Sequence, residues 1–70
     1  MAKRIDAGNF DGAHFNVDGF LGALREAIAT GDRVEIVGTP RIGIGGGRYN
    51  PAMVEIREAA RRSGAVIAWT

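Results

Sequence analysis

The most regular pattern in the chain is an apolar stripe with the 3.6-residue period of a helix, between residues 17 and 30. Asp18 stands where an N-cap is expected, because its carboxylate can accept from the free N–H groups of the first turn. Gly31 stands where a left-handed residue commonly ends a helix. We therefore predict an amphipathic helix over residues 18–30, whose apolar face comprises Val17, Phe20, Leu21, Leu24, Ala27 and Ile28.

A second helix is predicted to begin at Asn50, to run to Ser63 and to stop at Gly64. Asn50 can serve as its cap, and Pro51 suits the first helical position because that position needs no N–H donor. Val54 is the exception to the pattern, since it projects from the polar face. The expected apolar stripe of this helix comprises Ala52, Met53, Ile56, Ala59 and Ala60.

Strands are predicted in the segments around these helices. Residues 34–37 form a β-rich run, and residues 65–69 form a continuous apolar run that is typical of a strand buried on both faces of a parallel sheet. Apolar and polar positions alternate at residues 5–7 and again at 13–17, which predicts a short strand or hairpin. Residues 41–44 also alternate, and they either form a hairpin with the preceding run or belong to a long loop.

The order of elements is therefore strand, helix, strand, glycine loop, helix, strand. A strand–helix–strand crossover joins parallel strands, so we expect an α/β fold, with α+β as the alternative. The expected architecture is a single-layer sheet of three or four strands with two amphipathic helices, in one small domain spanning residues 1–70.

Length and composition favour self-association. A chain of 70 residues buries only about 60% of its unfolded surface, and so has a thin margin of stability. It has no cysteine, so neither disulfides nor thiolate–metal sites can reinforce the fold. Packing against other copies would supply the missing stability, and we expect a homo-oligomer.

The charge and hydropathy of the chain exclude some classes of protein. The formal net charge of +1 argues against a strongly basic coat for DNA. No apolar run is long enough to span a membrane, and the basic N-terminal residues are not followed by the apolar core of a signal peptide. The chain is therefore expected in the cytoplasm, away from membranes.

The glycine-rich segment Gly43–Gly47 is the feature that folding alone explains least. Four of its five residues are glycine, and it lies between a predicted strand and a predicted helix. Ligands of α/β proteins gather at such junctions, where free N–H groups favour an anion, and Arg41 and Arg48 could add charge. Arg48 occupies the third glycine position of the dinucleotide fingerprint, however, and no Walker pattern is present. The other interpretation is a loop or hairpin end whose glycines form turns.

Candidate catalytic and metal-binding residues are few. His14 is the only histidine and Ser63 the only serine, and neither has a partner at the spacing of an activated nucleophile. The carboxylates are scattered, without a metal-ligand spacing or a paired acid and base. We expect no enzymatic activity, no cofactor and no metal.

Surface positions suggest two further kinds of contact. Arginines at positions 48, 57, 61 and 62 could meet phosphates, although Glu55 and Glu58 interrupt the series and favour a solvated face. Tyr49 lies in the loop and could stack on a base. Trp69 is instead expected to pack in the terminal strand, because a small core needs it. The position of Val54 off the apolar stripe of its helix suggests contact with another chain.

Residues 23–38 resemble part of the bacterial histone-like HU/IHF family, in which a helix runs through a Gly-Asp turn into the first strand of a DNA-binding saddle. The fragment Arg48-Tyr-Asn-Pro51 is similar to the Arg-Asn-Pro tip of that family's arm, with one residue inserted. The resemblance implies DNA bending by a dimer, with Arg41 and Arg48 at phosphates. The chain departs from the family after Gly38, where Thr-Pro-Arg-Ile follows, and glycine replaces the basic arm. The segment after Asn50-Pro51 also differs, because its pattern predicts a helix rather than a strand.

Together these features favour a non-enzymatic interaction module that acts through protein–protein contacts and associates with itself. One alternative is an anionic small molecule or nucleotide bound at Gly43–Gly47, and another is nucleic-acid binding. The residues expected to bind a partner or ligand are Arg41, Gly43, Gly45, Gly46, Gly47, Arg48, Tyr49 and Val54.

Overall fold

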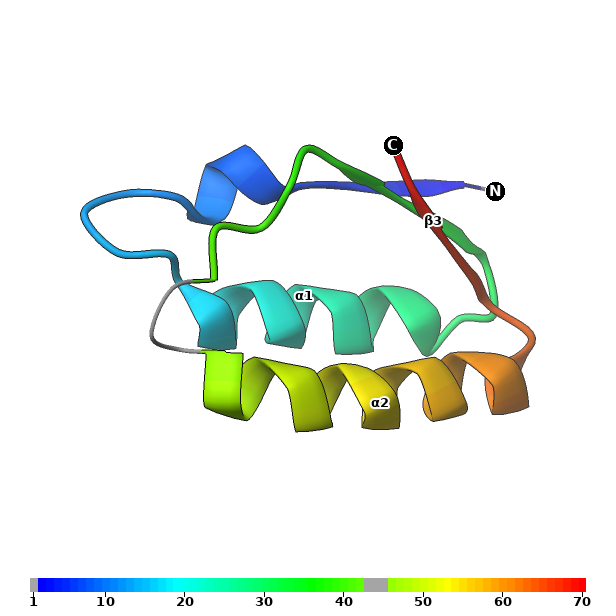
Figure 1. Cartoon of the computed structure of the whole chain (residues 1–70). Helices are drawn as coiled ribbons and strands as arrows, with labels where there is room; N and C mark the ends of the chain where they lie inside the picture. Colours follow the sequence, from blue (N-terminus) through cyan, green and yellow to red (C-terminus); the bar gives the residue numbers. More distant parts are fainter. Residues whose placement is uncertain (1, 43–45) are drawn as a thin grey trace.

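The fold is a small α/β sandwich of one sheet and one helical layer. The computed structural model describes residues 2–42 and 46–70, and within them the strands are β1 (Lys3–Asp6), β2 (Arg33–Val37) and β3 (Val66–Trp69). The strands form a parallel sheet in the order β1-β2-β3. The helices are α1 (Val17–Ile28) and α2 (Gly46–Ser63), and Figure 1 shows both of them on the same side of the sheet. The predicted α/β class and element order are confirmed.

The central strand β2 carries the sheet's part of the core. The register places Val34 beside Lys3 and Ile67, and Ile36 beside Ile5 and Trp69. Val34 and Ile36 are fully buried, so this row of the sheet faces the helices. Because side chains alternate along a strand, the intervening positions point to the face that no described helix covers. That open face carries Arg4, Asp6, Arg33, Glu35, Val37, Val66 and Ala68.

Helix α1 has the predicted apolar face, but its cap differs from the prediction. All six predicted core positions are buried, with Phe20 and Leu24 at zero exposure. The N-cap is Asn16, whose Oδ1 accepts from the Gly19 N–H at 3.0 Å. The prediction of Asp18 as the cap was wrong by two residues, because Val17 already joins the buried face. Asp18 instead lies in the first turn, where its charge complements the helix dipole.

Helix α2 begins at Gly46, so the predicted start at Asn50 was wrong by more than a turn. Its buried stripe also starts earlier, because half-buried Tyr49 lies in line with Met53, Ile56 and Ala60. Burial of Tyr49 explains why the chain continues the helix in front of Pro51. The proline then lies inside the helix and has no N–H to donate to the turn before it.

The segment between β1 and α1 contains no second strand, so of the two predicted alternatives the short strand is confirmed by β1 and the hairpin is not formed. The chain forms a 3₁₀ helix over Ala7–Phe10, and the Asp6 carboxylate accepts from the Gly8 N–H at 2.9 Å. Phe10 and Phe15 both pack edge-on against Phe20, with ring centroids 5.7 and 5.5 Å away. The alternation at residues 13–17 therefore reflects aromatic packing rather than a strand.

The C-terminal strand is parallel as predicted, but it is not buried on both faces. β3 pairs with β2 alone among the described strands, and the helices cover one face. Val66 is 54% exposed and Trp69 is 46% exposed, so the expectation that Trp69 packs in the core is also wrong. Arg41 and Ile42 lie in no strand, which excludes a hairpin with β2 for the described part of that segment; the rest of it, including Ile44, lies outside the described residues.

Two glycines of the α1 region provide a matched test of this packing. Gly31 has the predicted left-handed conformation, with φ +74°, although α1 ends earlier than predicted, at Ile28 with Ala29 as its C-cap. A Cβ at Gly31 would lie 2.7 Å from the Ser63 carbonyl oxygen. Gly22 lies inside α1, and a Cβ there would meet nothing within 4 Å. Gly31→Ala should lower the free energy of unfolding by about 2 kcal/mol, whereas Gly22→Ala should raise it by roughly 0.5–1 kcal/mol. Urea unfolding followed by circular dichroism measures the free energy of unfolding of both variants. Equal changes in the two variants would contradict the close approach of Gly31 to the Ser63 carbonyl oxygen.

Candidate functional site

The predicted ligand-binding arginines both lie beside carboxylates. Arg41 Nη1 is 3.6 Å from Asp11 Oδ2, and Arg48 Nη1 is 3.2 Å from Asp18 Oδ1. All four side chains come from the end of the sheet where β1 and β2 finish and α1 and α2 begin. Exposed ion pairs of this kind contribute less than about 1 kcal/mol to stability. They nevertheless offset the positive charge that an anion would need at this end of the molecule.

Tyr49 is part of an aromatic cluster and not an open stacking surface. Its ring stacks on Phe20, with centroids 6.4 Å apart and an interplanar angle of 28°. Phe10 and Phe15 also pack edge-on against Phe20, so the four rings connect the N-terminal segment, α1 and α2. Burial raises the pKa of the Tyr49 phenol above its ordinary value, an effect that the charge of Arg57 partly opposes. The geometry thus assigns Tyr49 a structural contact.

Tyr49 is the only tyrosine in the chain, so its ionisation can be followed directly by ultraviolet absorbance. The native protein should titrate above the ordinary pKa of about 10, and the urea-unfolded chain at that value. Because the folded-state pKa is raised, the packed neutral Tyr49 ring contributes its full stabilisation of the fold below about pH 10. This contribution is lost as the pH rises through the folded-state pKa of the phenol. A native titration at or below the unfolded value would contradict the packing of Tyr49 on Phe20.

The glycines of the predicted loop do not gather into a described site. Gly43 and Gly45 lie outside the described residues. Gly46 and Gly47 form the first turn of α2, and a Cβ at Gly47 would meet nothing within 4 Å. No close approach therefore explains Gly47, and the role expected for the whole loop stays a prediction.

Val54 lies on a different surface, a groove between α1 and α2 on the side of the helices that faces away from the sheet. The groove has a volume of about 680 Å³, and its apolar lining includes Ile28 and Ala29 of α1 and Val54 and Ala59 of α2. Val54 is 58% exposed, the highest value among the large apolar side chains described. The structure therefore separates Val54 from the other predicted site residues and places it on a hollow with an apolar lining.

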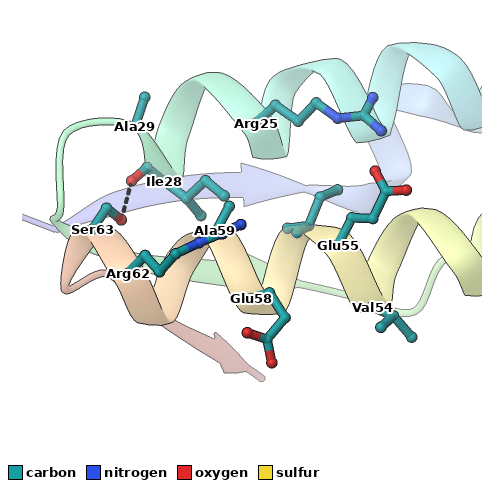
Figure 2. Close-up of a pocket in the computed structure, with 10 residues that line it drawn as sticks. Arg25, Ile28, Ala29, Val54, Glu55, Glu58, Ala59, Arg62 and Ser63 are labelled. Carbon is teal, nitrogen blue, oxygen red and sulfur yellow. Dashed lines mark hydrogen bonds between the residues drawn. The ribbon is translucent and has the colours of Figure 1, made fainter.

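Charged side chains of both signs surround this groove. Figure 2 shows Arg25 and Glu55 at one end and Arg62 at the other end, near Ile28 and Ser63. Glu55 and Arg62 are seven residues apart, which is two helical turns, so they lie on the same side of α2. The sequence suggested Val54 alone. The other lining residues were missed because they come from two helices whose packing was not known.

Ser63 joins the two helices at one end of the groove. Its Oγ donates to the Ile28 carbonyl oxygen at 2.8 Å and lies 3.2 Å from the Ala60 carbonyl oxygen (Figure 2). The last carbonyls of a helix lack partners within the helix, and the Ile28 carbonyl at the end of α1 accepts from Ser63 and from the Gly31 N–H, which is 3.2 Å away. The only serine of the chain thus has a structural contact that its sequence position did not indicate.

Removing this hydroxyl should loosen the contact between the helix ends. Ser63→Ala is expected to lower the free energy of unfolding by about 1 kcal/mol, because the Ile28 carbonyl loses the shorter of its two hydrogen bonds and keeps only that from the Gly31 N–H. Ser63→Thr keeps the hydroxyl and serves as the matched control, with a smaller loss. Chemical unfolding of both variants measures the difference, and an alanine variant as stable as the wild type would refute the contribution.

The described residues hold no group of three or more histidine, aspartate or glutamate side chains placed to bind a metal ion. Among them no polar or charged side chain is buried, and His14 is exposed. None of the described helices has the length and apolar character needed to cross a membrane.

Comparison of the chain with protein-family models, curated proteins and solved structures finds no match. The segment after Asn50-Pro51 is helical, which confirms the predicted departure from the HU/IHF pattern.

Proposed function

We propose that the protein is a non-enzymatic interaction module whose partner is a second copy of itself, bound through the groove between α1 and α2. The observation that carries the proposal is Val54, an exposed apolar side chain at a groove with an apolar lining and a rim of mixed charge. An isolated apolar side chain has little meaning on a surface, but one beside a hollow of complementary chemistry is typical of an interface.

The charges around the groove favour a copy of the same surface as the partner. A two-fold interface brings each residue of one patch against a different residue of the same patch in the other copy. If two α2 helices pack antiparallel with the axis between Glu58 and Ala59, Glu55 of each copy lies opposite Arg62 of the other. The same arrangement brings Val54 to the end of the partner's groove, where Ile28 and Ser63 lie.

This register has one further favourable property. Glu55 and Arg62 are each about 5 Å from the axis along the helix, given a rise of about 1.5 Å per residue. Two equivalent pairs of opposite charge then lie on the two sides of the axis, as polar rims flank interface cores.

Light scattering coupled to size-exclusion chromatography tests the proposal. The wild type should have the mass of a dimer, and Val54→Glu that of a monomer, because a buried charge without a partner costs several kcal/mol. Arg4→Glu, a charge reversal on the open sheet face, is the matched control and should remain dimeric. A monomeric wild type across a wide range of concentrations would reject self-association.

Charge reversal tests the register itself. Glu55→Arg and Arg62→Glu should each weaken self-association roughly tenfold or more, since each places two pairs of like charges across the axis. An equimolar mixture of the two variants should form a heterodimer, because every reversed charge then meets its opposite. Failure of the mixture to associate, while Val54→Glu still abolishes the wild-type dimer, would keep the groove as the interface and reject this register.

A further inference from the structure

The two edges of the sheet differ in a way that the proposed self-association does not use. β1 at one edge carries three charged side chains in its four residues, Lys3, Arg4 and Asp6. β3 at the other edge is Val-Ile-Ala-Trp, without a charge. Edge strands present unpaired N–H and C=O groups, and natural proteins usually protect such edges with charged side chains or a cover. Among the described strands, β3 pairs only with β2, so its outer edge has neither protection.

The backbone of β3 presents a defined set of hydrogen-bonding groups to a neighbour. The Thr70 N–H donates to the Ile36 carbonyl oxygen at 2.9 Å, so Thr70 and, by alternation, Ala68 face β2. Ile67 and Trp69 then direct their N–H and C=O groups away from β2. An additional strand can pair with these two residues without any change in the sheet.

A hollow beside this edge has apolar walls and a positive rim. It has a volume of about 300 Å³ and lies between β3 and α2, with Ile67 and Trp69 on the strand side. Its charged lining residues are Arg57 and Arg61, one turn apart on α2. Arg61 Nη2 is 2.8 Å from Glu58 Oε2, whereas Arg57 forms no ion pair with any described residue. The charge of this surface therefore favours an acidic occupant.

We propose that the outer edge of β3 binds an extended acidic segment of another protein, which adds to the sheet as a further strand. Addition of a strand to an open edge is a recurrent mode of peptide recognition, with affinity from the main chain and specificity from alternate side chains. Acidic residues at every second position reach Arg57 and Arg61, and their methylene groups cover the Trp69 indole. The intervening apolar residues lie beside Val66 and Ala68 on the open sheet face.

Trp69 reports occupancy of this edge directly, because it is the only tryptophan and is 46% exposed. The probe is a blocked six-residue peptide of alternating glutamate and valine, and the control peptide has lysine in place of glutamate. Titration with the acidic peptide should shift the Trp69 emission to shorter wavelength in a saturable manner, and the lysine peptide should not. The double variant Arg57→Glu with Arg61→Glu should weaken binding at least tenfold, whereas Arg25→Glu in the other groove should leave it unchanged.

Several results would overturn the proposal. These are an absent shift, an equal shift with the lysine peptide, or binding that persists in the Arg57→Glu, Arg61→Glu variant. A shift caused only by raising the protein concentration would instead identify a second copy as the occupant of the edge. Titration of the Val54→Glu variant distinguishes peptide binding at the β3 edge from self-association through the helix groove. The peptide should bind this variant with the same affinity as the wild type. Circular dichroism of each exposed-charge variant verifies the fold.

Discussion

Coverage of the sheet on one face only is the constraint from which most of this structure follows. The three strands follow the sequence order in space, so both connecting helices lie on the same side and pack against each other (Figure 1). Burial of Val34 and Ile36 beneath them contributes roughly 1.5–3 kcal/mol for each side chain. Parallel sheets are usually covered on both faces, and here the uncovered face carries charged residues that tolerate water.

The same arrangement determines where surface for contacts remains. Two helices side by side leave a groove on their outer face, and a sheet of three strands leaves an unpaired edge beside the second helix. The groove carries charges of both signs, which suits a copy of itself, whereas the edge hollow carries arginines alone. The two surfaces lie on different faces of α2, so occupation of one leaves the other accessible.

The sequence predicts the elements well where a single periodicity dominates. The apolar face of α1, a strand at residues 34–37 and the parallel direction of the strands follow from local patterns, and the structure has all of them. The sequence pattern gave the wrong N-terminus for each helix, because contacts with residues distant in the sequence determine where the helices begin. Asp18 and Asn50 are good caps by residue type, but the burial of Val17 and Tyr49 extends both helices in front of them.

The candidate site was less predictable for the same reason. Val54 was identified because it broke the pattern of its own helix, whereas Arg25, Ile28 and Ser63 belong to the groove only through the packing of α1 on α2. Trp69 was expected in the core on account of its size, yet its strand lies at the edge of the sheet, where one neighbour and one helical layer cannot enclose it. Strand order depends on the whole chain, so it cannot be predicted from the pattern of any short segment of sequence.

The parallel register also has a consequence for the order of folding. Every ladder in the sheet joins residues about thirty positions apart, as in Lys3 with Val34 and Arg33 with Val66. The entropy of closing such loops opposes strand pairing until a helix has formed and shortened the distance between the strand ends. The sheet therefore depends on α1 and α2 during folding as well as in the native state, because α1 connects the strands of one ladder and α2 connects those of the other. Such a chain should fold more slowly than a helical bundle of its size, despite its small number of elements.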